Sequence, residues 1–181
     1  MPKLLVTLGT TPGGIFETFE NLKRGNYEAE NHPPVHISEV YVIRTSDPAV
    51  NLAWKLVKAV FACCGGKEVT IADIPLEIND INSKQDFLTF KRAIKARLSP
   101  GDFVDFTGGR KAMSVAAAIE AREAGAKVVT TIIPQQEYVR ITNLLNSLKG
   151  QESAVEAGGR GECVLSFCDL VSKESRTVQL Y

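Results

Sequence analysis

The sequence predicts an α/β protein with an open, mainly parallel sheet, helices on both faces and a C-terminal β-hairpin. Two observations lead to this prediction. Short apolar runs alternate five times with longer segments of helical periodicity over residues 3–133. Each apolar run is also followed by a turn that contains glycine, proline or a helix-capping residue. A strand–helix–strand order of this kind places successive strands parallel, because the intervening helix returns the chain to the same edge.

The first half of the chain supplies the first two of these units. Residues 3–9 (KLLVTLG) predict a buried strand that ends in a tight turn, and residues 15–24 (IFETFENLKR) predict a helix. A polar loop follows, and residues 39–44 (EVYVIR) predict the second strand. The sequence TSDP then supplies a capping aspartate followed by proline, which is typical of a helix start. We expect this second helix to end at the two glycines that begin at Gly65.

The second half continues the alternation. The predicted elements are a strand at 68–74, a helix at 84–98, a strand at 102–106, a helix at 112–125 and a strand at 126–133.

The C-terminal region departs from this pattern. Residues 137–150 predict one more helix, and the glycine-rich segment 151–161 predicts a flexible connection. The last stretch, from Glu162 to Tyr181, predicts two strands around a polar turn at 172–175. We therefore expect one domain over residues 1–150, with residues 151–181 completing the same domain or a dimer.

Composition limits the possible functions. The chain has 181 residues with 21 Lys and Arg against 21 Asp and Glu, so its formal net charge is zero. A chain without excess positive charge is not expected to bind DNA or RNA in general, and any polyanion must be held by a local cluster. No apolar run reaches membrane-spanning length, and the N-terminal stretch turns glycine-rich too soon to be expected as a signal peptide. We expect a cytoplasmic protein without a membrane partner.

The cysteines and histidines do not form a metal-binding pattern. The chain has four cysteines, none in a C-x-x-C pair, and two histidines in a loop that contains proline. We therefore expect no metal and no cofactor. The four cysteines are expected to remain reduced thiols that pack as small apolar groups.

Three loops follow predicted strands and open predicted helices: residues 9–14 (GTTPGG), 44–48 (RTSDP) and 107–111 (TGGRK). They should therefore meet at the carboxyl edge of the sheet, where ligands bind in such folds. Backbone amides at helix N-termini make this edge suitable for an anion. The candidate ligand-binding residues are Gly9, Thr10, Thr11, Pro12, Gly13, Ser46, Asp47, Thr107, Gly108, Gly109, Arg110 and Lys111. For the first two loops, an ordinary strand-to-helix turn and an ordinary helix cap are the simpler interpretations.

The third loop, TGGRK, gives the strongest signal. Gly108 and Gly109 allow the backbone to approach a ligand closely. Arg110 offers a planar fork for a phosphate, and Lys111 adds a second positive charge. Cations in the first turn of a helix oppose its dipole and cost stability, which favours a functional role for this pair.

The segments VDFTGGRKAMSVAAA and LVTLGTTPGG closely resemble the two halves of the ligand site of CARF domains, the CRISPR-associated Rossmann folds. This resemblance covers roughly residues 3–133 and implies a Rossmann-like fold. It further implies a homodimer that binds a cyclic oligoadenylate across its two-fold axis. Only about 50 residues follow the fifth strand, too few for a separate effector domain, so the chain is similar to the stand-alone archaeal CARF ring nucleases.

Those enzymes cleave cyclic tetra-adenylate without a metal and switch off type III CRISPR defence. By resemblance, the catalytic residues are Thr11, Arg110 and Lys173. A CARF sensor that binds the ring without cutting it and regulates a partner is the alternative. A dinucleotide-dependent oxidoreductase is less favoured, because the G-x-G-x-x-G fingerprint is missing.

Overall fold

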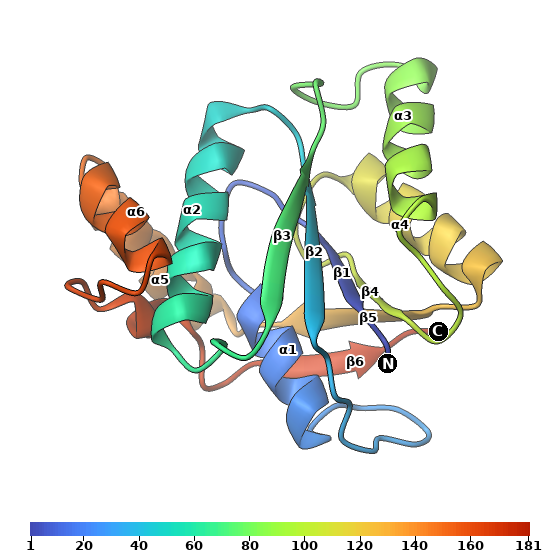
Figure 1. Ribbon diagram of the computed structural model, residues 1–181, viewed down its shortest axis with the longest axis horizontal. Helices are drawn as coiled ribbons and strands as arrows, with labels where there is room; N and C mark the ends of the chain where they lie inside the picture. Colours follow the sequence, from blue (N-terminus) through green and yellow to red (C-terminus); the bar gives the residue numbers. More distant parts are fainter.

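Six strands form one sheet in the computed structural model, which describes residues 1–181 (Figure 1). The strands are β1 (Leu4–Thr7), β2 (Glu39–Arg44), β3 (Thr70–Pro75), β4 (Phe103–Asp105), β5 (Lys127–Ile132) and β6 (Arg176–Gln179). Their order across the sheet is β3-β2-β1-β4-β5-β6. The first five strands run parallel, and β6 pairs antiparallel with β5. The predicted α/β class with a mainly parallel sheet is confirmed.

Helices cover both faces of this sheet. They are α1 (Ile15–Arg24), α2 (Pro48–Cys63), α3 (Lys84–Lys95), α4 (Lys111–Ala124), α5 (Gln135–Leu148) and α6 (Glu152–Gly159). Figure 1 shows α3 and α4 on one side of the strands and α1 and α2 on the other. None of the helices is both long and apolar enough to cross a membrane.

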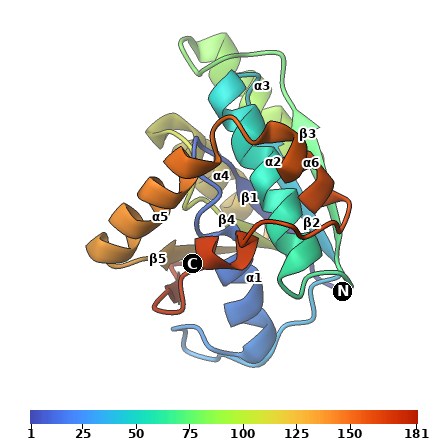
Figure 2. The same cartoon turned by 90° about the vertical axis from the view of Figure 1, so that its left-hand side faces the viewer.

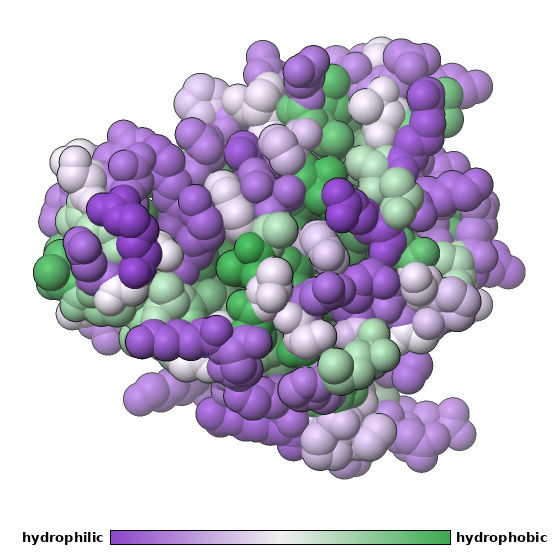
Figure 3. Space-filling model, viewed as in Figure 1, coloured by the Kyte–Doolittle hydropathy of each residue, from purple (hydrophilic) through white to green (hydrophobic).

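The two faces of the sheet have separate apolar cores. Along β1, Leu4 and Val6 pack in the core beneath α1 and α2, whereas Leu5 packs in the core beneath α3 and α4. Successive side chains of a strand point to opposite faces, so an uninterrupted apolar run fills both cores. Figure 3 shows a largely hydrophilic surface, with apolar side chains gathered in the middle of the view near the edge strand β3.

The C-terminal region differs from the sequence prediction in two ways. An antiparallel strand pair is present, but β5 and β6 form it, and the first of the two strands expected within residues 162–181 is absent. Its place is taken by an irregular segment and the 3₁₀ helix η1, Phe167–Leu170. The expected flexible connection is instead α6, which lies beside α2 (Figure 2).

The glycines of α6 explain why this segment looked flexible in the sequence. A Cβ atom on Gly158 would lie 2.3 Å from the ring of Phe167 and 3.1 Å from the Cβ of Ala59. Gly158 therefore allows α6 to approach α2 and η1 closely, and Val155 is fully buried in the same contact. Here glycine serves close packing rather than chain flexibility.

The prediction of reduced thiols is wrong, because all four cysteines are paired. Cys63 is bonded to Cys163 and Cys64 to Cys168, across sequence separations of 100 and 104 residues. Both bonds join the end of α2 to the C-terminal segment, one at Cys163 between α6 and η1 and the other at Cys168 within η1. The pairing depends on the packing of α6 against α2, which local sequence does not reveal.

Candidate functional site

A cavity of about 380 Å³ opens at the carboxyl ends of the parallel strands, where the sequence predicted a site. Of the predicted ligand-binding residues, those that line it are Gly9, Thr10, Thr11, Asp47, Thr107, Gly108, Gly109 and Arg110. Pro12, Gly13, Ser46 and Lys111 are not among its lining residues. The structure therefore brings the first and third loops together and adds the start of α2.

The glycines of the two main loops contact each other. A Cβ atom on Gly9 would lie 2.8 Å from the amide nitrogen of Gly109, and one on Gly108 would lie 2.8 Å from the carbonyl oxygen of Thr7. Gly109 also has a φ of +92°, which an L side chain rarely adopts. The sequence analysis related Gly108 and Gly109 to close approach of a ligand. The structure gives them an additional role, since they let the two loops lie against each other.

Three of the helices that begin at this edge follow the predicted loops, and their N-termini are satisfied differently. At α1, the Glu17 carboxylate accepts a hydrogen bond from the Gly14 amide at 3.0 Å. At α2, the Asp47 carboxylate accepts from the Ala49 amide at 2.8 Å, so the ordinary helix cap is present there. At α4, the N-cap residue Arg110 makes no side-chain cap. At α5, which also begins at this edge, the N-cap residue Pro134 makes no side-chain cap, but the first turn carries the acidic Glu137. The start of α4 is the one with neither a side-chain cap nor an acidic residue in its first turn, so it is the most suitable for an anion.

The open end of α4 combines free amides with positive charge. The amides of Lys111 and Ala112 have no hydrogen-bond acceptor within the protein. The Arg110 side chain is 72% exposed, and its Nε lies 3.4 Å from Oδ2 of Asp80. Lys111 is exposed and makes no ion pair. A ligand anion could therefore displace Asp80 from Arg110 and accept hydrogen bonds from the helix amides.

Asp80 belongs to a part of the site that the sequence analysis missed. The loop between β3 and α3 brings Asn79 and Asp80 into the cavity wall, and the Ser46 hydroxyl donates to Asn79 Oδ1 at 2.8 Å. The sequence contained a signal for this loop: it too follows a strand of the parallel sheet, and such loops reach the carboxyl edge. The other lining residues absent from the prediction are Leu8, Thr45, Val50, Met113 and Tyr138.

A buried polar network supports the third loop from below. Asp105, at the end of β4, is 1% exposed and accepts hydrogen bonds from the Thr107 amide at 2.8 Å and the Thr18 hydroxyl at 2.6 Å. The Thr131 and Thr177 hydroxyls, 2.7 Å apart, continue this network to β6. Burial raises the pKa of the Asp105 carboxyl, whereas the hydrogen bonds from Thr107 and Thr18 act in the opposite direction. The network fixes Thr107 at the cavity wall.

The structure places Lys173 outside this cavity. Lys173 lines a second hollow of about 380 Å³ together with Glu137 and Arg140, and it makes no ion pair. The two hollows adjoin through the first turn of α5, because Tyr138 lines the first and its neighbour Glu137 lines the second. Thr11 and Lys173 therefore face hollows on either side of α5 within one chain. No group of three or more His, Cys, Asp or Glu side chains converges as metal ligands would.

These features define a class of protein. A mainly parallel α/β sheet with glycine loops, an uncapped helix N-terminus and an arginine at its carboxyl edge is a Rossmann-like fold, and ligands bind such folds at this edge. No family model matches the sequence. The chain is 39% identical over 186 residues to a CRISPR system ring nuclease of Saccharolobus solfataricus, and the alignment covers 99% of this chain and 98% of that protein. The chain belongs to the family of stand-alone CARF ring nucleases.

Proposed function

We propose that the protein is a metal-independent ring nuclease of type III CRISPR defence. Its substrate is cyclic tetra-adenylate, which it cleaves to linear di-adenylate with a 2′,3′-cyclic phosphate and so removes the signal. The observation that carries the proposal is the open N-terminus of α4 beside Arg110, in a chain of the ring nuclease family. A linked ring of phosphodiesters offers the anions that this end of the helix can bind.

The reaction we propose uses a nucleophile of the substrate itself. The 2′-oxygen of a ribose attacks the adjacent phosphorus, so the O2′–P bond forms and the P–O5′ bond breaks. The 2′-hydroxyl gives up its proton, and the leaving 5′-oxygen takes one up. The protein accelerates this step by holding the 2′-oxygen in line with the leaving oxygen, and the nucleophile needs no metal-bound water.

Three residues take the catalytic roles. Thr11 hydrogen-bonds a phosphate oxygen or orients the 2′-hydroxyl. Arg110 and the amides at the start of α4 stabilise the negative charge that builds on the phosphoryl oxygens. Lys173 supplies a second cation from the adjoining hollow, and its freedom from ion pairs supports this role. The ligand lies over the first turn of α5, which separates the two hollows.

A homodimer with the ring on its two-fold axis fits the size of the site. A cavity of about 380 Å³ is at the lower end of the range for small-molecule sites, so it suits part of a nucleotide ring rather than the whole. On α4, Val115 and Ile119 are exposed one turn apart, and on α5 Tyr138 and Val139 are exposed beside the cavity. Exposed apolar side chains of this kind are suited to an interface between subunits.

The first test is to incubate the protein with cyclic tetra-adenylate in excess EDTA and to identify the products by chromatography and mass spectrometry. The expected product is linear di-adenylate that ends in a 2′,3′-cyclic phosphate. An intact ring that elutes together with the protein would contradict cleavage and identify a sensor. Analytical ultracentrifugation with and without the ring tests the dimer, and a monomer that binds one whole ring would contradict the shared site.

A further inference from the structure

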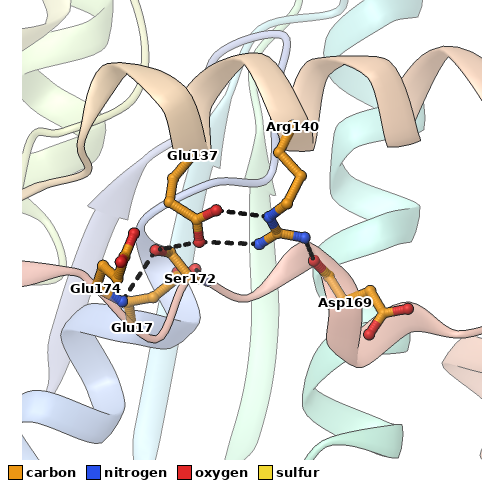
Figure 4. A network of polar contacts seen from close by, with 6 residues as sticks. All are labelled: Glu17, Glu137, Arg140, Asp169, Ser172 and Glu174. Carbon is orange, nitrogen blue, oxygen red and sulfur yellow. Dashed lines mark hydrogen bonds and ion pairs between the residues drawn. The ribbon is translucent and has the colours of Figure 1, made fainter.

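The buried carboxylate of Glu17 joins two segments that the proposed mechanism requires. Glu17 lies in the first turn of α1 and is 4% exposed. Its Oε2 accepts a hydrogen bond from the Gly14 amide at 3.0 Å, and its Oε1 accepts one from the Ser172 amide at 2.9 Å. Gly14 ends the loop that carries Thr11, and Ser172 directly precedes Lys173. One side chain thus connects the surroundings of both residues, and Figure 4 shows Glu17 beside Ser172.

Only one of these two bonds is needed to cap the helix. A glutamate at the third position of a helix that accepts from the N-cap amide forms one half of a capping box, and the N-cap residue Gly14 has no side chain to form the other half. The bond to Ser172 reaches a residue 155 positions away and plays no part in that cap. The second oxygen therefore serves the C-terminal segment.

The remaining contacts of that segment hold it on both sides of Lys173. The Ser172 hydroxyl donates to Glu137 Oε1 at 2.9 Å, and the Glu174 amide donates to the Ser172 hydroxyl at 3.2 Å. Arg140, which pairs with Glu137, donates to the carbonyl oxygen of Asp169 at 2.6 Å. Figure 4 shows these side chains converging on Ser172 from α1, α5 and the C-terminal segment. The backbone at Lys173 is therefore fixed although its side chain is exposed.

No cation partners the Glu17 carboxylate in the structure, and burial raises its pKa while the amides of Gly14 and Ser172 act in the opposite direction. A buried carboxylate held only by backbone amides costs stability that an apolar residue would not. Such a placement is expected where the position of the bonded backbone matters more than stability.

We propose that Glu17 is a positioning residue that fixes Lys173 relative to the Thr11 loop by bonding the amides of Gly14 and Ser172 at once. This inference rests on the proposed function, since it assigns a role in the cleavage step to the segment that Glu17 holds. Glu17 touches no substrate in this scheme. It acts through the backbone of Ser172 and therefore through Lys173.

The variant Glu17→Gln tests the inference, because glutamine can still accept from the Gly14 amide but has one acceptor oxygen for two amides. We expect its kcat for cyclic tetra-adenylate to fall about 10- to 100-fold, as a small misplacement of a catalytic group would cause. The dissociation constant for the ring should change less than twofold or threefold. Glu20→Gln is the matched control on α1: Glu20 pairs only with Arg24 and should retain full activity.

The decisive measurement is a double-mutant cycle of kcat with Lys173→Ala. If Glu17 acts through Lys173, then Glu17→Gln should have little further effect once Lys173 is alanine. Hydrogen exchange should also rise at the Ser172 amide in Glu17→Gln, with the strands of the sheet unchanged. Purely structural damage would instead lower the rate by the same factor in both backgrounds and raise exchange throughout α1.

The outcomes separate this inference from the proposed function. A wild-type protein that leaves the ring intact would overturn both. Cleavage by the wild type, with additive effects of the two substitutions or an unchanged kcat in Glu17→Gln, would overturn the role of Glu17 alone. The role of Glu17 would be supported if Glu17→Gln lowered kcat in the wild-type background but not in the Lys173→Ala background. Hydrogen exchange should then rise only locally, at the Ser172 amide.

Discussion

The glycine-loop cavity and the backbone around Ser172 satisfy their polar groups in opposite ways. At the glycine-loop cavity, the amides at the start of α4 lack acceptors, and Arg110 is held only by an exposed contact with Asp80. Around Ser172, the Ser172 amide and hydroxyl, the Glu174 amide and the Arg140 guanidinium all donate to partners, and the Glu137–Arg140 pair closes the network. Unsatisfied donors indicate where a ligand binds, whereas satisfied ones indicate which backbone is held in place.

This contrast also explains why the two regions should respond differently to substitution. A donor that is open in the free protein contributes to binding and little to folding. A buried acceptor such as Glu17 or Asp105 contributes to the arrangement of the free protein, because its loss leaves other buried groups without partners. Three changes test this distinction.

The largest effect is expected for Arg110→Ala, at the open cavity. Losing this cation should lower kcat for ring cleavage about 10²- to 10³-fold, as is typical when a donor to a developing oxyanion is removed. The midpoint of denaturant unfolding should hardly move, since the side chain is 72% exposed. Steady-state kinetics and urea unfolding measure the two quantities.

Arg122→Ala is the control for Arg110→Ala, because Arg122 is an exposed arginine in the last turn of the same helix. It should retain normal kinetics. Equal losses in both variants would indicate that charge anywhere on α4 matters, and the contrast between the two regions would fail.

The second change breaks the two disulfides that join the C-terminal segment to the end of α2. Reducing both disulfides should lower the free energy of unfolding by about 2–5 kcal/mol, because each closes a long loop in the unfolded chain. Removing one bond, with Cys63→Ser and Cys163→Ser, should cost much less than half of that. The remaining bond starts and ends within five residues of the one removed, so it still restricts nearly the same loop.

Chemical unfolding of the oxidised, reduced and single-bond proteins measures these differences. Affinity for the cyclic ring should stay the same in all three, because no cysteine lines the glycine-loop cavity. Equal, additive losses from the two bonds would contradict the loop-entropy argument. A loss of affinity on reduction would show that the cavity depends on the C-terminal segment.

The smallest effect is expected for Thr18→Val, in the buried network below the cavity. It removes the hydroxyl that contacts Asp105, the Gly14 carbonyl oxygen and the Thr131 hydroxyl, without changing the shape of the side chain. The free energy of unfolding should fall by about 1–3 kcal/mol, the cost of leaving a buried acceptor short of a partner. The matched control is Thr70→Val on β3, where the side chain is exposed and stability should hardly change. If both variants unfold at the same urea concentration, the network does not support the loop as described.

Much of the fold and of the site could be predicted because the signals are local. Apolar runs, helix caps and glycine turns lie within a few residues of the elements they determine, and the carboxyl-edge rule then brings Thr11 and Arg110 to one cavity. The uncapped start of α4 is explained by Arg110, which stands at the N-cap and has no side-chain acceptor for the helix amides.

Other features depended on contacts across a hundred or more residues. The sequence established an alternating α/β sheet and the loops at its ligand edge, since these follow from periodicity and short-range geometry. Only the tertiary structure decided that α6 packs on α2, that the four cysteines pair across it, and that Glu17 holds Ser172 beside Lys173. The physical reason is that such contacts form only when distant segments are packed together, and no local pattern specifies which segments meet.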